Sequence, residues 1–144
     1  MDAAATTILN DIVLTLKAMG CFAHVGLGRA GSESDVPRAH VEIDSLEHFR
    51  PDDSAGTYWV RLGARISLHT RSNDPAEAVR RMANLCAQVC EALLEDAYRG
   101  GFCQDLPIGE ATQIVRRDAS AAVRRPEVEG SVLVYCHYAV SEDA

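Results

Sequence analysis

The sequence predicts an α+β fold in which two α-helices pack on one face of a mostly antiparallel β-sheet, in the order α-β-β-β-α-β-β. Apolar residues recur with a helical period at residues 3–19 and again at 75–97, and strict polar–apolar alternation runs through residues 57–71. Shorter strand-like stretches flank these segments. The chain has 144 residues, of which 47% are hydrophobic and 24% charged, so we expect a single domain over residues 1–144.

The first helix is predicted at residues 3–19. Ile8, Ile12 and Leu16 lie about one turn apart on an apolar stripe. Gly20 follows, and glycine can end a helix in the left-handed conformation. We expect a short strand at 21–25 and then a polar, glycine-rich loop at 26–37.

Two strands are predicted next. Residues 38–44 alternate, with Arg38, His40, Glu42 and Asp44 on one side, and a loop is expected at 47–56. Residues 57–71 alternate along their whole length. This stretch is longer than an ordinary strand, so we expect a bulge or bend at Gly63.

The second helix is predicted from Pro75. Asp74 can cap its first turn, proline suits the first helical position, and Glu77 completes an arrangement like a capping box. Gly100 and Gly101 are expected to end the helix. Its predicted apolar stripe comprises Val79, Met82, Cys86, Val89, Cys90, Leu93 and Ala97.

The final strands are predicted at residues 111–118 and 131–140, with an exposed loop at 119–130. The last strand is apolar on both sides. This pattern indicates a central strand, or a strand whose second side is covered by another subunit.

Composition excludes several classes of protein. The net charge of −7 argues against a duplex-DNA binder that works by neutralising phosphates. No run of about 18 apolar residues is present, so we expect no membrane-spanning helix. The five cysteines form no CxxC pair, and their odd number does not suggest a disulfide framework, so we expect reduced thiols in a cytosolic setting.

One segment matches a cofactor motif without its context. Residues 26–31 (GLGRAG) fit the dinucleotide pattern G-x-G-x-x-G, whose mechanism needs a helix to begin at the glycines. The following residues, SESDVP, are acidic and begin no amphipathic helix. We therefore expect a loop and no cofactor.

The cysteines are the other candidates for chemistry. Cys86 and Cys90 are spaced so that two thiolates could bind one metal, but both lie on the apolar stripe, so we expect packing residues and no metal. Cys136 and His137 are neighbours on a strand and point to opposite faces. Cys103 is the plausibly exposed thiol, with no base predicted beside it. We therefore expect no catalytic residue and no enzymatic activity.

The polar side of residues 57–71 is rich in arginine and lies opposite acidic residues of the preceding strand. Cross-strand ion pairs on a solvated face are one interpretation. The other is a subunit interface, because Trp, Tyr and Arg carry much of the energy of protein–protein contacts. The candidate interface residues are Trp59, Arg61, Arg65, His69, Arg71, Glu42, Asp44 and Tyr135.

Six segments together have a recognisable order and spacing. They are the helix at 3–19, PRAHVEI at 37–43, WVR running into ISLHTR at 59–71, the long helix from Pro75, GEAT at 109–112 and VLVYCHY at 132–138. Their arrangement resembles the tail terminator (tail completion) proteins of long-tailed bacteriophages and phage-like particles. The resemblance lies in element order and covers most of the chain.

The resemblance implies a structural virion protein of the tail–neck region that is assembled in the cytoplasm of the host bacterium. Such subunits close into a ring, expected to be a homohexamer, which caps the tail tube, ends its polymerisation and joins tail to head. The implied partners are the tail tube protein and the head–tail connector or stopper protein, with DNA passing through the lumen without specific binding.

Three loops are expected to reach these partners. The candidate contact residues in them are Arg29, Asp52, Asp53, Arg124 and Arg125. Two alternatives remain: another neck or tail subunit, and a small-molecule-binding or enzymatic α+β domain.

Overall fold

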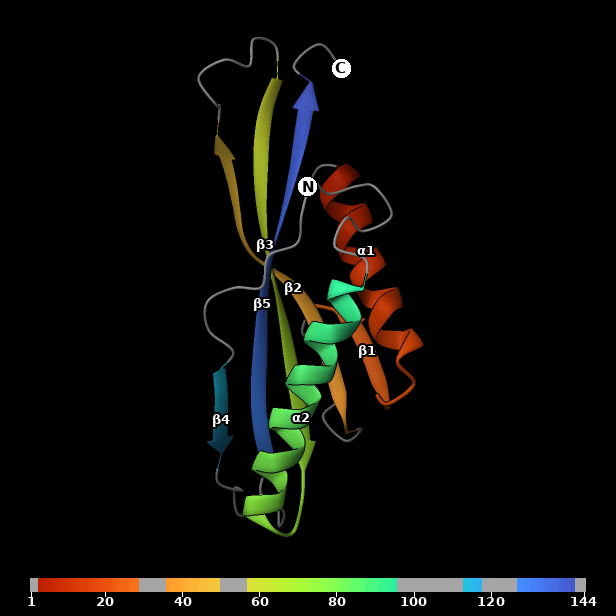
Figure 1. Cartoon of the computed structure of the whole chain (residues 1–144), viewed down its shortest axis with the longest axis vertical. Coiled ribbons are helices and arrows are strands. Elements are labelled where there is room, and N and C mark those ends of the chain that lie inside the picture. The colour runs from red at the N-terminus through yellow and green to blue at the C-terminus, as the bar shows by residue number, and fades with distance from the viewer. Residues whose placement is uncertain (1–2, 29–35, 50–56, 96–112, 118–126, 142–144) are drawn as a thin grey trace.

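The computed structural model describes residues 3–28, 36–49, 57–95, 113–117 and 127–141. Within these residues, two helices and five strands follow one another in the predicted order, and the five strands belong to one sheet with the spatial order β1-β2-β3-β5-β4 (Figure 1). The elements are α1 (Ala3–Ala18), β1 (His24–Leu27), β2 (Arg38–Phe49), β3 (Thr57–Arg71), α2 (Pro75–Leu94), β4 (Gln113–Arg117) and β5 (Glu127–Ser141).

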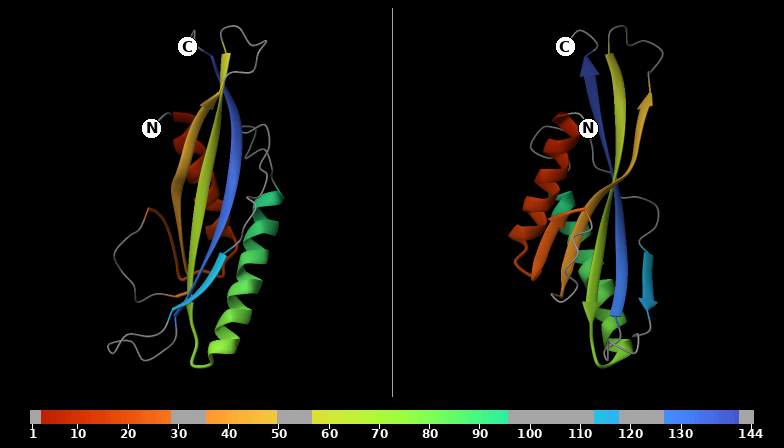
Figure 2. Two further views of the ribbon diagram at one scale, coloured as in Figure 1. Left: turned by 90° about the vertical axis from the view of Figure 1, so that its left-hand side faces the viewer. Right: turned by 180° about the vertical axis from the view of Figure 1, so that it is seen from behind.

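The sheet is mostly antiparallel, as predicted. β1 runs parallel to β2, while the pairs β2–β3, β3–β5 and β4–β5 are antiparallel. Viewed from behind, the long strands β3 and β5 lie in front of α2 (Figure 2). The predicted fold class, an α+β domain with both helices on one face of the sheet, is confirmed.

The helices form where the sequence supplies caps and apolar stripes. The Asp74 carboxylate accepts a hydrogen bond of 3.0 Å from the backbone N–H of Ala76 and so caps α2. Most of the predicted stripe of α2 is buried, but Val79 is 37% exposed and Ala78 is buried in its place. The predicted stripe residues that are buried are Met82, Cys86, Val89 and Leu93. Cys90 is half-buried.

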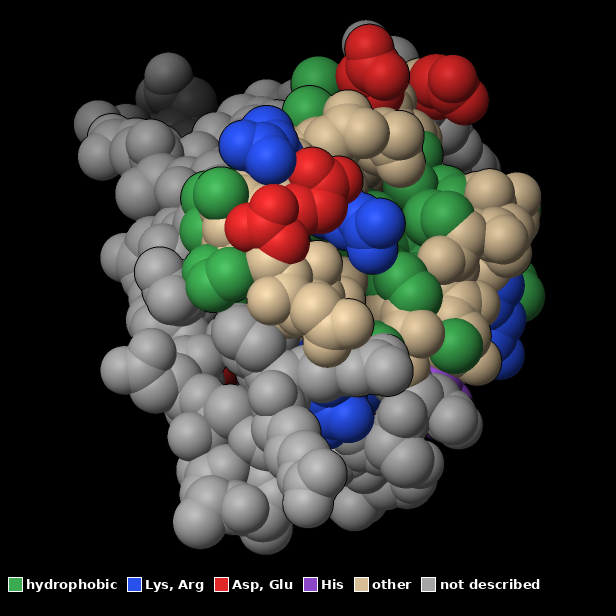
Figure 3. Space-filling model, turned by 90° about the horizontal axis from the view of Figure 1, so that it is seen from below, with side chains coloured by type: hydrophobic (Ala, Val, Ile, Leu, Met, Phe, Trp, Pro, Cys, Tyr) green, Lys and Arg blue, Asp and Glu red, His purple; other side chains and the backbone are tan. Residues whose placement is uncertain are grey.

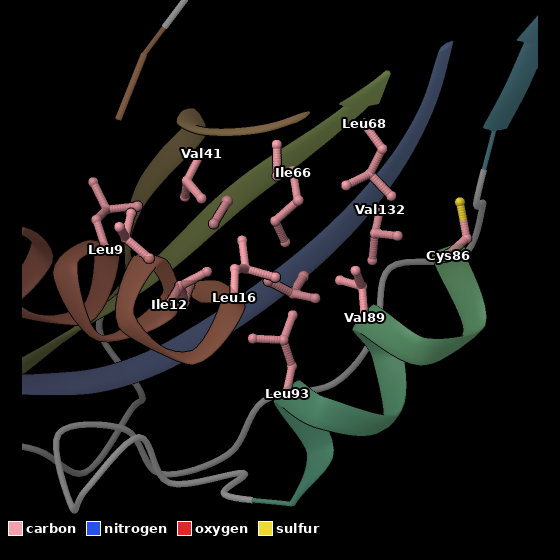
Figure 4. Packing of buried hydrophobic residues seen from close by; sticks show 14 of the residues in the cluster. Leu9, Ile12, Leu16, Val41, Ile66, Leu68, Cys86, Val89, Leu93 and Val132 are labelled. Atoms are coloured by element: carbon pink, nitrogen blue, oxygen red, sulfur yellow. The ribbon is translucent and has the colours of Figure 1, made fainter. Parts of the chain in front are cut away.

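The core lies between the helices and one face of the sheet. Leu9, Ile12 and Leu16 from α1 and Val89 and Leu93 from α2 point toward the strands (Figure 4). Burying one such side chain completely stabilises the fold by about 1.5–3 kcal/mol. Strand residues that meet them include Val41, Ile66, Leu68 and Val132, all with no exposed surface.

The sheet is five strands wide at one end and three at the other. β1 pairs with residues 38–41 of β2, and β4 pairs with residues 127–131 of β5. Above these pairs, β2, β3 and β5 are the strands of the described residues that continue, and they project past α2 (Figure 1). We call this part, residues 42–49, 57–65 and 132–141, the three-stranded half.

Several predicted boundaries are wrong, and β2 shows why. This strand continues to Phe49, whereas its predicted end was at 44 with a loop from 47. Its register shifts between Ile43 and Ser45, so Asp44 is an extra residue in a β-bulge. The extra residue moves the next apolar position from 45 to Leu46. A prediction that assumes uninterrupted alternation could not show that the strand continues beyond the bulge.

A bulge or bend was predicted at Gly63, and a bulge does occur opposite this residue, but on the neighbouring strand. β3 runs through Gly63 in unbroken register with β5, and the bulge lies on the adjacent β2. A Cβ on Gly63 would collide with the hydroxyl of Ser45, so a glycine accommodates the displaced backbone of β2.

The shorter strands begin and end elsewhere than expected. β1 covers 24–27 and not 21–25, so it includes two residues that were assigned to a loop. β5 begins at Glu127, inside the predicted loop 119–130, and β4 is five residues long. The predicted end of α2 at Gly100 and Gly101 lies outside the described residues.

Candidate assembly interface

The face of the sheet opposite the helices, which we call the open face, carries the predicted interface residues. Alternation along β3 directs Trp59, Arg61, Arg65, His69 and Arg71 to this face. Register adds Glu42 from β2 and Tyr135 from β5, and the bulge adds Asp44. All eight are therefore on one face, but they separate into groups with different environments.

Arg65 is paired within the subunit. Its Nε and Nη2 both donate to Oδ1 of Asp44, at 3.0 and 2.7 Å, although Glu42 is its direct partner in the register. The bulge brings Asp44 into reach. Both side chains are about one third exposed, so this pair contributes on the order of 0–1 kcal/mol. The expected cross-strand ion pair is confirmed for Arg65 and Asp44.

Arg61 leans toward β5. Its guanidinium carbon lies 3.9 Å from the centre of the Tyr135 ring, which is a cation–π contact. Its Nε is buried and has no hydrogen-bond partner among the described residues. Tyr135 lies beside Gly63, where a Cβ would come within 3.2 Å of the ring. The glycine therefore leaves room for the tyrosine beneath Arg61.

Glu47 is the acidic residue that faces Arg61 across β2 and β3. Its side chain is exposed, and no described residue forms a hydrogen bond or ion pair with it. Arg61 thus stacks on the tyrosine of β5, and it forms no salt bridge of 4.0 Å or less with the Glu47 carboxylate opposite it. Sequence reasoning did not select Glu47, because the bulge that puts it on the open face was not predicted.

The five-stranded half of the open face holds a histidine cluster, made of His24, His40 and His69 from three neighbouring strands. The ring of His40 lies 5.6 Å from that of His24 and 6.1 Å from that of His69, measured between centroids. His40 and the adjacent Arg38 are each only 4% exposed. His69, predicted as an interface residue, therefore has packing partners inside the subunit.

Burial lowers the pKa of His40 below its ordinary value, and charge on His69, His24 and Arg38 lowers it further. A hydrogen bond to the backbone of Gly28 acts in the opposite direction. Within the part of the chain that the structure describes, Nδ1 of His40 is buried and has no hydrogen-bond partner. Alternation already placed Arg38 and His40 on one side of β2, but only the strand order brings His24 and His69 to them.

The cysteine predictions hold in part. Cys86 and Cys136 are buried, with 3% and 0% exposure, whereas Cys90 is half-buried and Cys21 is exposed. Burial raises the pKa of the Cys86 thiol to about 11, and Cys90 beside it adds to the shift. No group of three or more His, Cys, Asp or Glu side chains in the described residues is arranged to hold a metal ion.

Two other surface features are a charged end of the molecule and an apolar hollow. The end of the molecule where α2 begins presents acidic and basic side chains next to each other (Figure 3). Here Glu77 pairs with Arg80 and Arg81, each at 3.2 Å. An open hollow of about 350 Å³ beside β1 and α1 is lined mainly by apolar residues, among them Leu9, Leu27 and Ile43.

Most of each predicted partner-contact loop lies outside the described residues. Arg29, Asp52, Asp53, Arg124 and Arg125 all lie outside the described residues. No helix in the described part of the chain is long and apolar enough to cross a membrane. No protein-family model and no curated protein matches this chain.

Proposed function

We propose that the protein is a structural subunit of a phage or phage-like tail that assembles into a ring, caps the tail tube and joins the tail to the head. The proposal begins from the sequence resemblance to tail terminators, which implied a small α+β subunit. The observed fold is of this kind, which supports the proposal without being specific to it.

The observation that carries the proposal is the three-stranded half of the sheet. It projects beyond α2 (Figure 1). On the open face it gathers Trp59, Arg61, Tyr135 and Glu47, and Glu47 forms no hydrogen bond or ion pair within the described residues. Aromatic residues and arginine are enriched where protein–protein contacts are strongest. A ring needs two different patches on each subunit, and this half has two different edges and a polar face available for them.

The alternative function, a small-molecule-binding or enzymatic domain, has less support in the described residues. The hollow beside β1 has few polar groups that converge on its interior, whereas ligand sites combine apolar walls with a few well-placed polar groups. The two buried thiols lie in the core and not in that hollow. Assembly is therefore the function that the geometry supports best.

The test is to interrupt the reading frame in the phage or particle that encodes it and to image the products. We expect tubes longer than normal, heads without tails, or both, and normal particles when the intact chain is supplied in trans. A Leu14→Lys chain is a matched control, because Leu14 is 63% exposed on α1, and it should restore normal particles. Infectious particles of normal length without the protein would exclude the proposed function.

A further inference from the structure

The histidine cluster joins three neighbouring strands of the sheet. His40 of β2 lies between His24 of β1 and His69 of β3, with its ring centroid 5.6 and 6.1 Å from theirs. Gly26 makes room for this arrangement, because a Cβ there would come within 3.1 Å of Nε2 of His24. Gly26 is also the residue that faces His40 in the register. The missing side chain therefore lets the ring of His24 lie over β1 next to His40.

His40 also holds the end of β1 in place. It is 4% exposed, and its ring donates a hydrogen bond to the backbone of Gly28, since a bond that the ring donates is one that raises the pKa of a histidine. Gly28 directly follows β1, and its own N–H donates to the carbonyl of Val41 at 2.8 Å. Before the strand, the N–H of Ala23 donates to the carbonyl of Pro37 at 2.7 Å. The four-residue strand β1 is thus fastened at both of its ends.

The groups that act on His40 are basic. Burial lowers its pKa most, and the charges of His69, His24 and Arg38 lower it further. Strands β1 and β3 lie on either side of His40. The described charged or titratable residues that face or flank it are His24, Arg38, Glu42, Arg65 and His69, with Glu129 next to His69 on β5. The two carboxylates in this set are not among the groups whose charge shifts the pKa of His40. A proton on His40 therefore adds a buried positive charge beside groups of the same sign.

We propose that the histidine cluster is a pH switch that holds β1 on the sheet at neutral pH and releases it in acid. When the cluster gains protons, repulsion among its members and hydration of His40 favour a state in which residues 24–28 leave β2 while the rest of the sheet stays folded. Release widens the apolar hollow beside α1, because Leu27 and Gly28 line it together with Leu9 and Val41. The switch thus couples pH to the exposure of an apolar surface. It goes beyond the proposed function and does not rest on it.

β1 can open by itself because it contributes little to the core. Val25 is half-buried against the core cluster, and His24 and Leu27 are exposed. Without β1, β2 still pairs with β3 along residues 38–49. Exposed edge segments of this kind open at a lower free energy than central strands. One histidine with the ordinary pKa of 6.5, if protonated only in the open state, raises the open population at pH 5 by about thirty-fold, which is the upper limit for a single residue.

Amide hydrogen exchange of the full chain, measured by NMR and expressed as protection factors, tests the switch. Between pH 7.5 and 5 the protection of the Gly28 amide should fall several-fold, up to about thirty-fold, while that of Leu62 in the central strand β3 stays the same. His40→Gln should remove most of this fall, because glutamine can still donate to Gly28 but does not titrate. His48→Gln is the matched control. His48 is also on β2, but its ring lies 5.5 Å from that of Tyr58, outside the cluster, so this variant should behave as the unaltered chain does.

Three results would overturn the switch. They are a protection of Gly28 that changes by less than about two-fold, an equal fall in His40→Gln and the unaltered chain, and an equal fall at Gly28 and Leu62, which would mean that the whole fold opens. If His40→Gln does not fold, His24→Gln carries the test. His24 is exposed and supplies one of the charges that act on His40, so its replacement should reduce the fall, and an undiminished fall would overturn the inference. Failure of the switch leaves the proposed function standing, because that function is tested by tube length.

Discussion

Replacing Gly130 with alanine should destabilise the fold through one identifiable collision. Gly130 lies on β5 opposite Leu68, with its α-carbon facing α2. An added Cβ would lie 2.6 Å from Sδ and 2.9 Å from Cγ of Met82, and 3.2 Å from Sγ of Cys86. Met82 has no exposed surface, so its sulfur can move only by displacing other core atoms.

The magnitude follows from two opposing effects. Inserting a methyl group into a well-packed core costs about 1–3 kcal/mol, and replacing glycine with alanine recovers about 0.4–1 kcal/mol by restricting the unfolded chain. The expected net loss is about 1–2 kcal/mol, which for a chain of this length lowers Tm by roughly 3–8 °C. Guanidinium or thermal unfolding followed by circular dichroism measures it directly.

A double-variant cycle identifies the collision as the cause. Met82→Ala alone should cost about 2–5 kcal/mol, because it leaves a cavity in the core. In the double variant the new methyl group enters part of that cavity, so the combined loss should be smaller than the sum by about 1 kcal/mol or more. Additive losses, or a Gly130→Ala protein as stable as the original, would refute the close packing of α2 on β5.

Two further predictions concern titratable groups. The pKa of His40 in the folded protein lies below its ordinary value of 6.5, so the unfolded chain binds more protons, and the stability contributed by His40 is fully present above pH 6.5 and falls as the pH decreases through that value. Unfolding midpoints measured between pH 7.5 and 5 should show this fall, and His40→Gln should make it less steep. An equal slope in both proteins would contradict the role of His40. The pKa of Cys86 is raised to about 11, and its thiol is buried. Its alkylation by iodoacetamide at pH 7.5 should therefore be at least about a hundred-fold slower than that of the exposed Cys21, as measured by mass spectrometry of the native protein. Comparable rates would show that α2 opens.

The order of the helices and strands could be predicted because the spacing of apolar residues that identifies each element lies within that element's own segment. Ile8, Ile12 and Leu16 report the helical repeat of α1, and Asp74 reports the start of α2 through a cap that the structure contains. The ends of strands were less predictable, because a strand ends where its partner does. The residues of β5 that pair with β4 at 127–131 include charged ones that resembled a loop.

The candidate interface could be predicted only as a set. Alternation along β3 placed Arg61, Arg65 and His69 on one face, yet they differ in what they contact. Arg65 binds Asp44 because a bulge lies between Ile43 and Ser45, and His69 packs near His40 because β2 is its neighbour. Pairing between distant strands determines these environments, and no spacing along one segment contains that information.

The central ladder of the sheet also has a consequence for the order of events in the cell. β3 pairs along its whole length with β5, whose residues 127–141 are synthesised long after 57–71. Until then β3 has β2 on one side and an open edge on the other. The part of the sheet on which α2 packs is then incomplete, because β5 is missing from it. During synthesis the chain therefore passes through an intermediate that contains β2, β3 and α2 but lacks β5, and this is the species that a chaperone would meet. The three-stranded half therefore takes its final form only after the last strand has been made.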